Sequence, residues 1–158
     1  MKLNMHKGFL FLLLTISVFM TSCDRNQIYE ENFQIDKGIW NVRKPAVFDV
    51  EISRLNLRYN VYLNLRNAPD YPYSNLFVFL TTTYPDGKKS KDTLELTLAD
   101  YDGRWLGTGM GSVKFSRFRL KNNVQFNKAG HYRFEMEQAM RVNDLKGIHD
   151  IGLRIEKQ

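Results

Sequence analysis

The sequence predicts an all-β protein, an antiparallel β-sandwich of about seven or eight strands with Greek-key or jelly-roll connections. Apolar and polar residues alternate with a period of two through most of the chain, which is typical of strands with one buried face. Turn signals such as Tyr84–Gly87 and Asn127–Gly130 separate these stretches at intervals of about 8 to 12 residues. A sustained helical period is missing, and only residues 136–145 could host a short helical turn.

Length and composition indicate a single domain after removal of a leader. The chain has 158 residues, of which 43% are hydrophobic and 13% aromatic, so it can bury enough apolar surface to offset the conformational entropy lost on folding. We divide it into a signal peptide over residues 1–22, a lipidated start and short tether over residues 23–27, and a β-sandwich domain over residues 28–158. The tether is short, so the domain should sit close to a membrane surface.

The first 23 residues are typical of a secretory leader. Residues 1–7 contain Lys2 and Lys7 and no acidic residue, and an apolar run follows over residues 8–20. This run is shorter than the roughly 20 residues that a membrane-spanning helix needs. The small residues Thr21 and Ser22 before Cys23 resemble a bacterial lipobox. In such signals the cysteine thiol receives a diacylglyceryl group, cleavage occurs on its amino side, and a fatty acid such as palmitate is often added to the new amine.

Five stretches show the strand alternation clearly. They are residues 48–52, 59–66, 90–98, 132–137 and 151–156. Residues 76–80 form instead a continuous apolar run, which predicts a central strand that is covered on both faces or passes beneath a loop. Residues 84–87 then predict a hairpin turn. In segment 113–120 the apolar residues fall at odd-numbered positions up to Phe115 and at even-numbered positions from Phe118 on. This shift predicts a β-bulge near Ser116.

Charge and cysteine content exclude several classes of protein. The formal charge of +6 falls to +4 when Lys2 and Lys7 leave with the leader, because 21 basic residues then face 17 acidic ones. These charges are scattered along the chain, whereas nucleic-acid-binding proteins concentrate basic residues on one stripe. Cys23 is the only cysteine, so no intrachain disulfide can form.

None of the motifs that carry common chemistry is present in the sequence. The glycines of residues 107–111 lack a following Lys-Ser/Thr and open no helix, so they do not form a phosphate-binding loop. The aspartates lack the spacing of a calcium loop, and His131 and His149 lack that of a zinc site. None of the serines lies in a G-x-S-x-G elbow. We therefore expect no catalytic residue, no metal and no cofactor, and we interpret the protein as non-enzymatic.

The loop over residues 99–111 is the strongest candidate for a partner surface. Within it, residues 100–107 combine Asp, Arg and Trp between glycines, and aromatic residues and Arg dominate the energy of many interfaces. The candidate surface comprises Tyr101, Asp102, Arg104, Trp105 and Trp40. Two alternatives remain at this point: the Trp105 side chain could close the end of the sandwich instead, or Tyr101, Trp105 or Trp40 could stack on a sugar in a carbohydrate-binding lipoprotein.

Several strings distributed over nearly the whole chain resemble the gliding-motility lipoprotein family GldH of Bacteroidota. They are Ser22–Asp24, Tyr62–Asn67, Asp70–Phe77, Leu98–Asp100, Asp102–Gly107, Glu137–Arg141 and Gly152–Glu156. The resemblance implies an accessory lipoprotein of the gliding apparatus, associated with type IX secretion, that performs no reaction. It implies envelope proteins as partners, and Cys23 is the only site residue that the resemblance supplies.

The residues after Cys23 bear on which membrane carries the anchor. Asp24 would retain a lipoprotein in the inner membrane under the enterobacterial sorting rule. Arg25 follows Asp24, so the acidic run associated with surface export in Bacteroidota is missing. We expect a lipid-anchored protein on the periplasmic face of the outer membrane.

Overall fold

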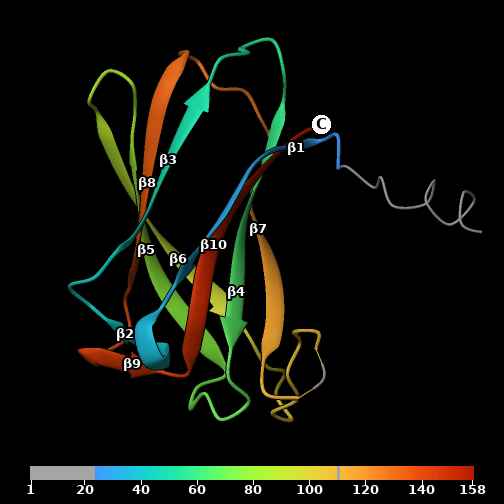
Figure 1. Cartoon of the computed structure of the whole chain (residues 1–158), viewed down its shortest axis with the longest axis vertical. Coiled ribbons are helices and arrows are strands. Elements are labelled where there is room, and N and C mark those ends of the chain that lie inside the picture. Colours follow the sequence, from blue (N-terminus) through green and yellow to red (C-terminus); the bar gives the residue numbers. More distant parts are fainter. Residues whose placement is uncertain (1–23, 110) are drawn as a thin grey trace, which may run out of the picture.

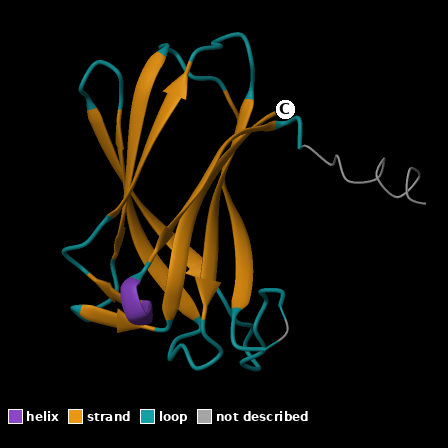
Figure 2. Cartoon of the chain, viewed as in Figure 1, coloured by secondary structure: helices purple, strands orange, loops and turns teal. Residues whose placement is uncertain are grey.

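A computed structural model describes residues 24–109 and 111–158, which form ten strands and one short 3₁₀ turn (Figures 1 and 2). The predicted leader over residues 1–22 and the predicted lipidation site Cys23 lie outside the described residues. The elements are β1 (Gln27–Gln34), η2 (Asp36–Gly38), β2 (Ile39–Asn41), β3 (Ala46–Ile52), β4 (Tyr59–Asn67), β5 (Asn75–Thr83), β6 (Lys89–Thr97), β7 (Lys114–Val124), β8 (Gly130–Gln138), β9 (Asp144–Lys146) and β10 (Ile148–Lys157).

Two four-stranded antiparallel sheets pack face to face, which confirms the predicted β-sandwich. One sheet has the order β1-β10-β4-β7, and the other has the order β3-β8-β5-β6. A two-stranded ribbon of β2 and β9 lies at the bottom of the sandwich in Figure 1. The strands β1, β7, β3 and β6 are edges of their sheets, so the sandwich is open along two sides.

The alternation in the sequence places one apolar face of each sheet in a common core. In β3 the side chains of Phe48, Val50 and Ile52 are buried while Asp49 and Glu51 are exposed. The same two-residue period places Leu63 of β4 and Leu153 of β10 in the core. Burial of these apolar faces is the main favourable contribution to folding.

Strand β5 shows how its continuous apolar run is accommodated. Its residues alternate between buried and half-buried, so only one face lies in the core. The segment after β8 continues beside β5 in the same sheet: the amide of Ala139 donates to the carbonyl oxygen of Phe77 (2.8 Å), and the Phe77 amide donates to Sδ of Met140 (3.4 Å). Farther along, the ammonium of Lys91 lies 4.4 Å from the ring centre of Phe79. The outer face is half-buried, with the Lys91 side chain over part of it, so the prediction that both faces are fully covered is wrong.

Two local predictions are wrong. The register of β7 against β4 is regular from Lys114 to Arg119, so no bulge lies at Ser116, and the irregularities fall between Arg119 and Val124 instead. The parity change arises because Phe115 points out of the core, where the Arg117 guanidinium lies 5.7 Å from its ring centre. Residues 136–145 form no helical turn, because the end of β8 and the whole of β9 pair with other strands.

The two ends of the sandwich differ in what they carry. We call the end with loops 53–58, 84–88 and 125–129 the terminal end, because residues 24–26 and 158 also lie there (Figure 1). The amide of Gln158 donates to the Arg58 carbonyl oxygen, and the amide of Lys157 donates to that of Asn26. The opposite end, with the β2–β9 ribbon and loops 68–74, 98–113 and 139–143, is the far end. Over the described residues we find no helix long and apolar enough to cross a membrane.

Candidate functional site

The loop after β6 begins with a compact turn at the far end of the sandwich. Oδ1 of Asp100 accepts hydrogen bonds from the amides of Asp102 (3.0 Å) and Arg104 (2.8 Å), and the Asp100 amide donates to the Arg104 carbonyl oxygen (2.9 Å). Gly103 completes the turn at φ +80°, a conformation that glycine adopts without steric cost. The side chain of Asp100 therefore folds residues 100–104 into a defined shape.

The glycine-rich second half of this loop packs on the start of β7. Thr108 and Phe115 exchange two backbone hydrogen bonds of 2.8 and 2.7 Å. A Cβ atom at Gly107 would lie 2.6 Å from Oγ of Ser116 and 2.9 Å from the Phe115 carbonyl oxygen. Glycine at position 107 thus permits close approach of two backbone segments. This packing role explains the glycine without a phosphate-binding loop.

The structure places the four candidate residues of this loop in different surroundings. Tyr101 is 97% exposed, and the Arg104 guanidinium is also exposed while it donates to Oδ2 of Asp102 over 2.9 Å. The Trp105 side chain is half-buried against the core, with its ring centre 6.4 Å from that of Tyr71. Three of the candidates are therefore accessible to a partner, and Trp105 exposes only part of its side chain.

Trp40 does not share this surface. Its side chain is 1% exposed within the core, and its indole Nε1 donates to the Lys44 carbonyl oxygen over 3.0 Å. The pairing of β2 with β9 brings it there, and Trp40 lies opposite Leu145 in that ribbon. An enclosed indole offers no face to a sugar or a protein, so Trp40 is omitted from the partner surface proposed below.

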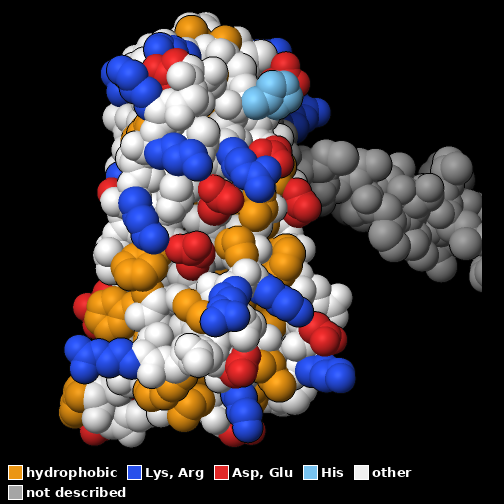
Figure 3. All heavy atoms as spheres, turned by 90° about the vertical axis from the view of Figure 1, so that its left-hand side faces the viewer, with side chains coloured by type: hydrophobic (Ala, Val, Ile, Leu, Met, Phe, Trp, Pro, Cys, Tyr) orange, Lys and Arg blue, Asp and Glu red, His pale blue; other side chains and the backbone are white. Residues whose placement is uncertain are grey.

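Exposed hydrophobic side chains gather around the far end, a feature that the sequence pattern does not reveal. Two of the large exposed hydrophobic residues in the described part of the chain, Ile28 and Tyr84, lie toward the terminal end. The others lie at or near the far end: Phe33, Ile39, Val42, Tyr73, Tyr101, Leu106, Phe115 and Val142. On the face in Figure 3 most hydrophobic surface lies in the lower half, toward this end. This end is therefore a candidate for a binding surface, because exposed apolar side chains that form a contiguous patch often mark such surfaces.

At the terminal end, Arg154 holds the start of the described chain against the domain. The Arg154 side chain is buried on the outer face of its sheet and forms ion pairs with Asp24, Glu30 and Glu156. Burial alone would lower the pKa of Arg154, but hydrogen bonds to these carboxylates outweigh burial and raise it. The amide of Asn26 and the Arg154 side chain lower the pKa of Asp24 below 3.8. The residue after Cys23 is thus fixed to the sandwich by its own side chain.

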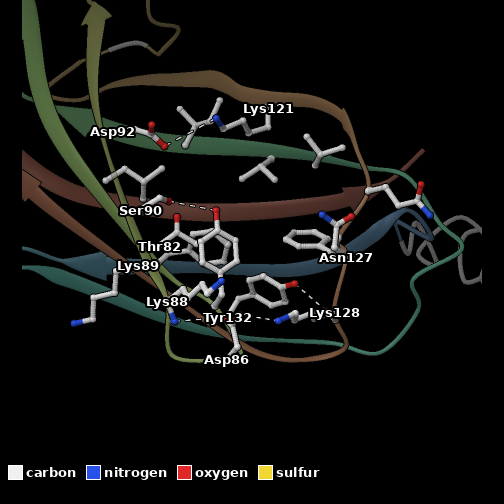
Figure 4. Close-up of a pocket in the computed structure, with 18 residues that line it drawn as sticks. Thr82, Asp86, Lys88, Lys89, Ser90, Asp92, Lys121, Asn127, Lys128 and Tyr132 are labelled. Atoms are coloured by element: carbon white, nitrogen blue, oxygen red, sulfur yellow. Dashed lines mark hydrogen bonds and ion pairs between the residues drawn. The ribbon is translucent and has the colours of Figure 1, made fainter.

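A cavity of about 530 Å³ opens beside the terminal end, between edge strands β6 and β7 (Figure 4). Leu80, Leu120, Val124 and Phe134 line it, together with aromatic rings. Phe126 and Tyr132 meet edge to face, with 4.8 Å between their ring centres. No single segment reveals this cavity in the sequence, because its lining comes from both sheets.

The rim of the cavity is polar and mostly basic. Lys88, Lys89, Lys121 and Lys128 lie there with Asp86 and Asp92. Nζ of Lys128 lies 2.7 Å from Asp86, and Nζ of Lys121 lies 4.0 Å from Asp92, while Lys89 points away from the cavity (Figure 4). Lys128 holds the pKa of Asp86 below its usual value of 3.8 by a side-chain hydrogen bond.

Nowhere among residues 24–109 and 111–158 do three or more His, Cys, Asp or Glu side chains lie close enough together to hold a metal ion. The far-end surface combines the exposed phenol of Tyr101 and the exposed guanidinium of Arg104 with surrounding apolar side chains. The cavity has apolar walls and a charged rim, which suit a molecule with an apolar part and a charged part.

Comparisons with known proteins agree on one family. The model of the GldH lipoprotein family matches residues 27–155. The chain is 36% identical to a gliding motility lipoprotein GldH homolog from Christiangramia forsetii, over 93% of this chain and 94% of that protein. It is 32% identical to the gliding motility lipoprotein GldH of Flavobacterium johnsoniae, over 93% and 95% of the two chains.

Among solved structures, dimeric latent PorU from Porphyromonas gingivalis aligns with 87% of this chain and 14% of its own, at a TM-score of 0.35 and 10% identity. A similarity this weak supports no conclusion about fold or function.

Proposed function

The chain belongs to the GldH lipoprotein family, and from this premise we propose that it is a non-enzymatic, envelope-anchored component of the gliding apparatus, associated with type IX secretion. Its anchor is lipid on Cys23, in the periplasmic face of the outer membrane. Its task is to present the far end of the sandwich to another envelope protein. The observation that carries the proposal is the concentration of exposed hydrophobic side chains, with Tyr101 and Arg104, at the end opposite the start of the domain.

The geometry of the described chain supports this orientation. Cys23 is joined to Asp24 by one peptide bond, so their Cα atoms are about 3.8 Å apart. Because Arg154 binds Asp24, lipid on Cys23 would place the terminal end against the bilayer. The length of the sandwich then separates the far end from the membrane. Tyr101, Asp102, Arg104 and Trp105 form the proposed partner surface, together with the neighbouring apolar residues.

The anchor is tested by Cys23→Ala, with fractionation of the envelope and protease treatment of intact cells. Without the thiol neither lipid addition nor lipoprotein cleavage can occur, so the variant should remain an uncleaved precursor or enter the soluble envelope fraction. The unchanged protein should fractionate with the outer membrane and resist protease until that membrane is opened. Normal maturation and membrane fractionation of Cys23→Ala would contradict the proposal.

The partner is tested by affinity purification of the mature lipoprotein from crosslinked envelopes. We expect one or a few envelope proteins that are recovered with the unchanged protein and lost with Arg104→Ala. Lys146→Ala, an exposed basic residue elsewhere at the far end, serves as the matched control and should leave recovery unchanged. Recovery of no envelope protein with several crosslinking chemistries would count against the proposal.

A further inference from the structure

The cavity between β6 and β7 combines an apolar interior with an open side. Its interior side chains come from both sheets, and its volume of about 530 Å³ falls within the range of about 300–1,000 Å³ typical of small-molecule sites. Both flanking strands are edges, so no further strand closes this side of the sandwich. The interior therefore suits a flexible hydrocarbon chain that enters from the side.

The basic side chains at the rim favour a negatively charged ligand over a neutral one. Three lysines, Lys88, Lys121 and Lys128, lie there with two aspartates, and each aspartate already has a lysine partner. Within the described part of the chain Lys88 takes part in no ion pair within 4.0 Å, and Lys89 points away from the cavity (Figure 4), so these three lysines leave the rim with one excess positive charge. An anionic headgroup would gain attraction to these ammonium groups that a neutral headgroup would lack.

The terminal end as a whole is also basic. Its loops 53–58, 84–88 and 125–129 and residues 24–26 contain five basic side chains against two acidic ones. The basic residues are Arg25, Arg54, Arg58, Lys88 and Lys128. The cavity thus lies beside the end of the domain that would meet the membrane, and that end has the charge that favours an anionic lipid surface.

We propose that this cavity binds one acyl chain of an anionic phospholipid from the membrane, with the phosphate at Lys88. The proposal goes beyond the function proposed above, although it rests on the anchorage at Cys23 that is part of that function. A chain held in this way adds a second, non-covalent lipid contact to the covalent anchor. It also fixes the rotation of the domain about the anchor, so that the partner surface is presented in one direction.

Photo-crosslinking in vesicles tests the proposal. The mature lipoprotein, purified from its own envelope, is reconstituted into phosphatidylcholine vesicles that contain phosphatidylglycerol with a diazirine at the end of one acyl chain. Phosphatidylcholine with the same diazirine chain is the neutral control probe. Flotation of the vesicles first establishes that the protein is anchored, and peptide mass spectrometry then locates the adducts.

We expect adducts on cavity residues such as Val124, Phe126 and Tyr132, with a higher yield from phosphatidylglycerol than from phosphatidylcholine. The variant Lys88→Gln should lower the phosphatidylglycerol yield by about fivefold. The matched variant Lys146→Gln, at the far end, should leave it unchanged. Val124→Trp, which fills the cavity, should lower the yield from both probes, and its melting temperature checks that it folds.

Two outcomes overturn the proposal and can be told apart. If the protein fails to float with the vesicles, the anchorage at Cys23 is wrong, and this proposal falls with it. If the protein floats but its cavity residues carry no adducts, the anchorage stands and only the lipid site is wrong. The second outcome includes attraction of headgroups to the basic end without insertion, because the diazirine would then stay in the bilayer.

Discussion

The two tryptophans of the chain lie in different surroundings that the sequence does not distinguish. Both follow a short polar turn that contains an aspartate and a glycine, Asp36–Gly38 before Trp40 and Asp102–Arg104 before Trp105. Trp40 is enclosed because its short strand pairs with β9, whose residues lie more than 100 positions later. Trp105 lies at the edge of the core, where Tyr71 covers part of its ring. Burial at both positions depends on contacts between distant segments, and no local pattern encodes them.

Replacing Trp40, Trp105 and Tyr101 by alanine, one at a time, should separate their roles in stability and in binding. Trp40→Ala should lower the free energy of unfolding by roughly 3–5 kcal/mol, because it empties a closed part of the core. Trp105→Ala should lower it by about 1–2 kcal/mol, in proportion to its partial burial. Tyr101→Ala should change it by less than about 0.5 kcal/mol while reducing partner recovery. Urea unfolding followed by circular dichroism measures all three, and a large loss for Tyr101→Ala would contradict its assignment to the exposed surface.

The ion pairs of Arg154 give a second prediction at this scale. Arg154→Gln should destabilise the domain by about 3 kcal/mol, because Glu30 and Glu156 would keep their charge at a half-buried site without their main cation. The matched control is Arg133→Gln, whose partner Asp49 is exposed, and its effect should stay within about 0.5 kcal/mol. Urea midpoints at neutral pH compare the two variants, and equal shifts would refute a structural role for the Arg154 cluster.

Individual strands can be predicted from the sequence where one face is exposed to solvent and the other is buried in the core. β3, β4, β6, β8 and β10 all match stretches of clear alternation. β1 was missed because it is an edge strand with mostly exposed side chains, so its sequence shows little alternation. β2 and β9 have three residues each, too few to establish a period. The bulge was misplaced because an exposed aromatic, Phe115, looks in the sequence like a core residue.

The turn formed by residues 100–104 permits a test at the scale of an element. Asp100→Ala removes the carboxylate that accepts two amide hydrogen bonds, so the turn should open. The amides of Asp102 and Arg104 should then exchange with deuterium faster, and partner recovery should fall. Asp100→Asn keeps one acceptor oxygen, so it should restore much of the protection from exchange and much of the partner recovery. If exchange rises in Asp100→Ala while recovery is unchanged, the shape of this turn does not matter for binding.

The two ends of the whole molecule carry different features, and the proposed function follows from this separation. The fold class followed from the period of the sequence, but which loops share an end depends on strand order and could not be predicted from it. Only the folded chain shows that the start of the domain, the basic loops and the cavity occupy one end. Loop 99–111 and most exposed hydrophobic side chains occupy the other. A lipid anchor at one end and a recognition surface at the other would suit a protein that holds a partner near a membrane.

Site-specific photo-crosslinking in intact cells can show which end of the sandwich meets the partner and which end meets the membrane. A photoreactive amino acid replaces Tyr101 at the far end in one strain and Arg54 at the terminal end in another. We expect a discrete protein adduct from position 101 that disappears when Arg104→Ala is added, and lipid adducts without that protein from position 54. The same protein adduct from both positions, or protein adducts from position 54 alone, would contradict this orientation.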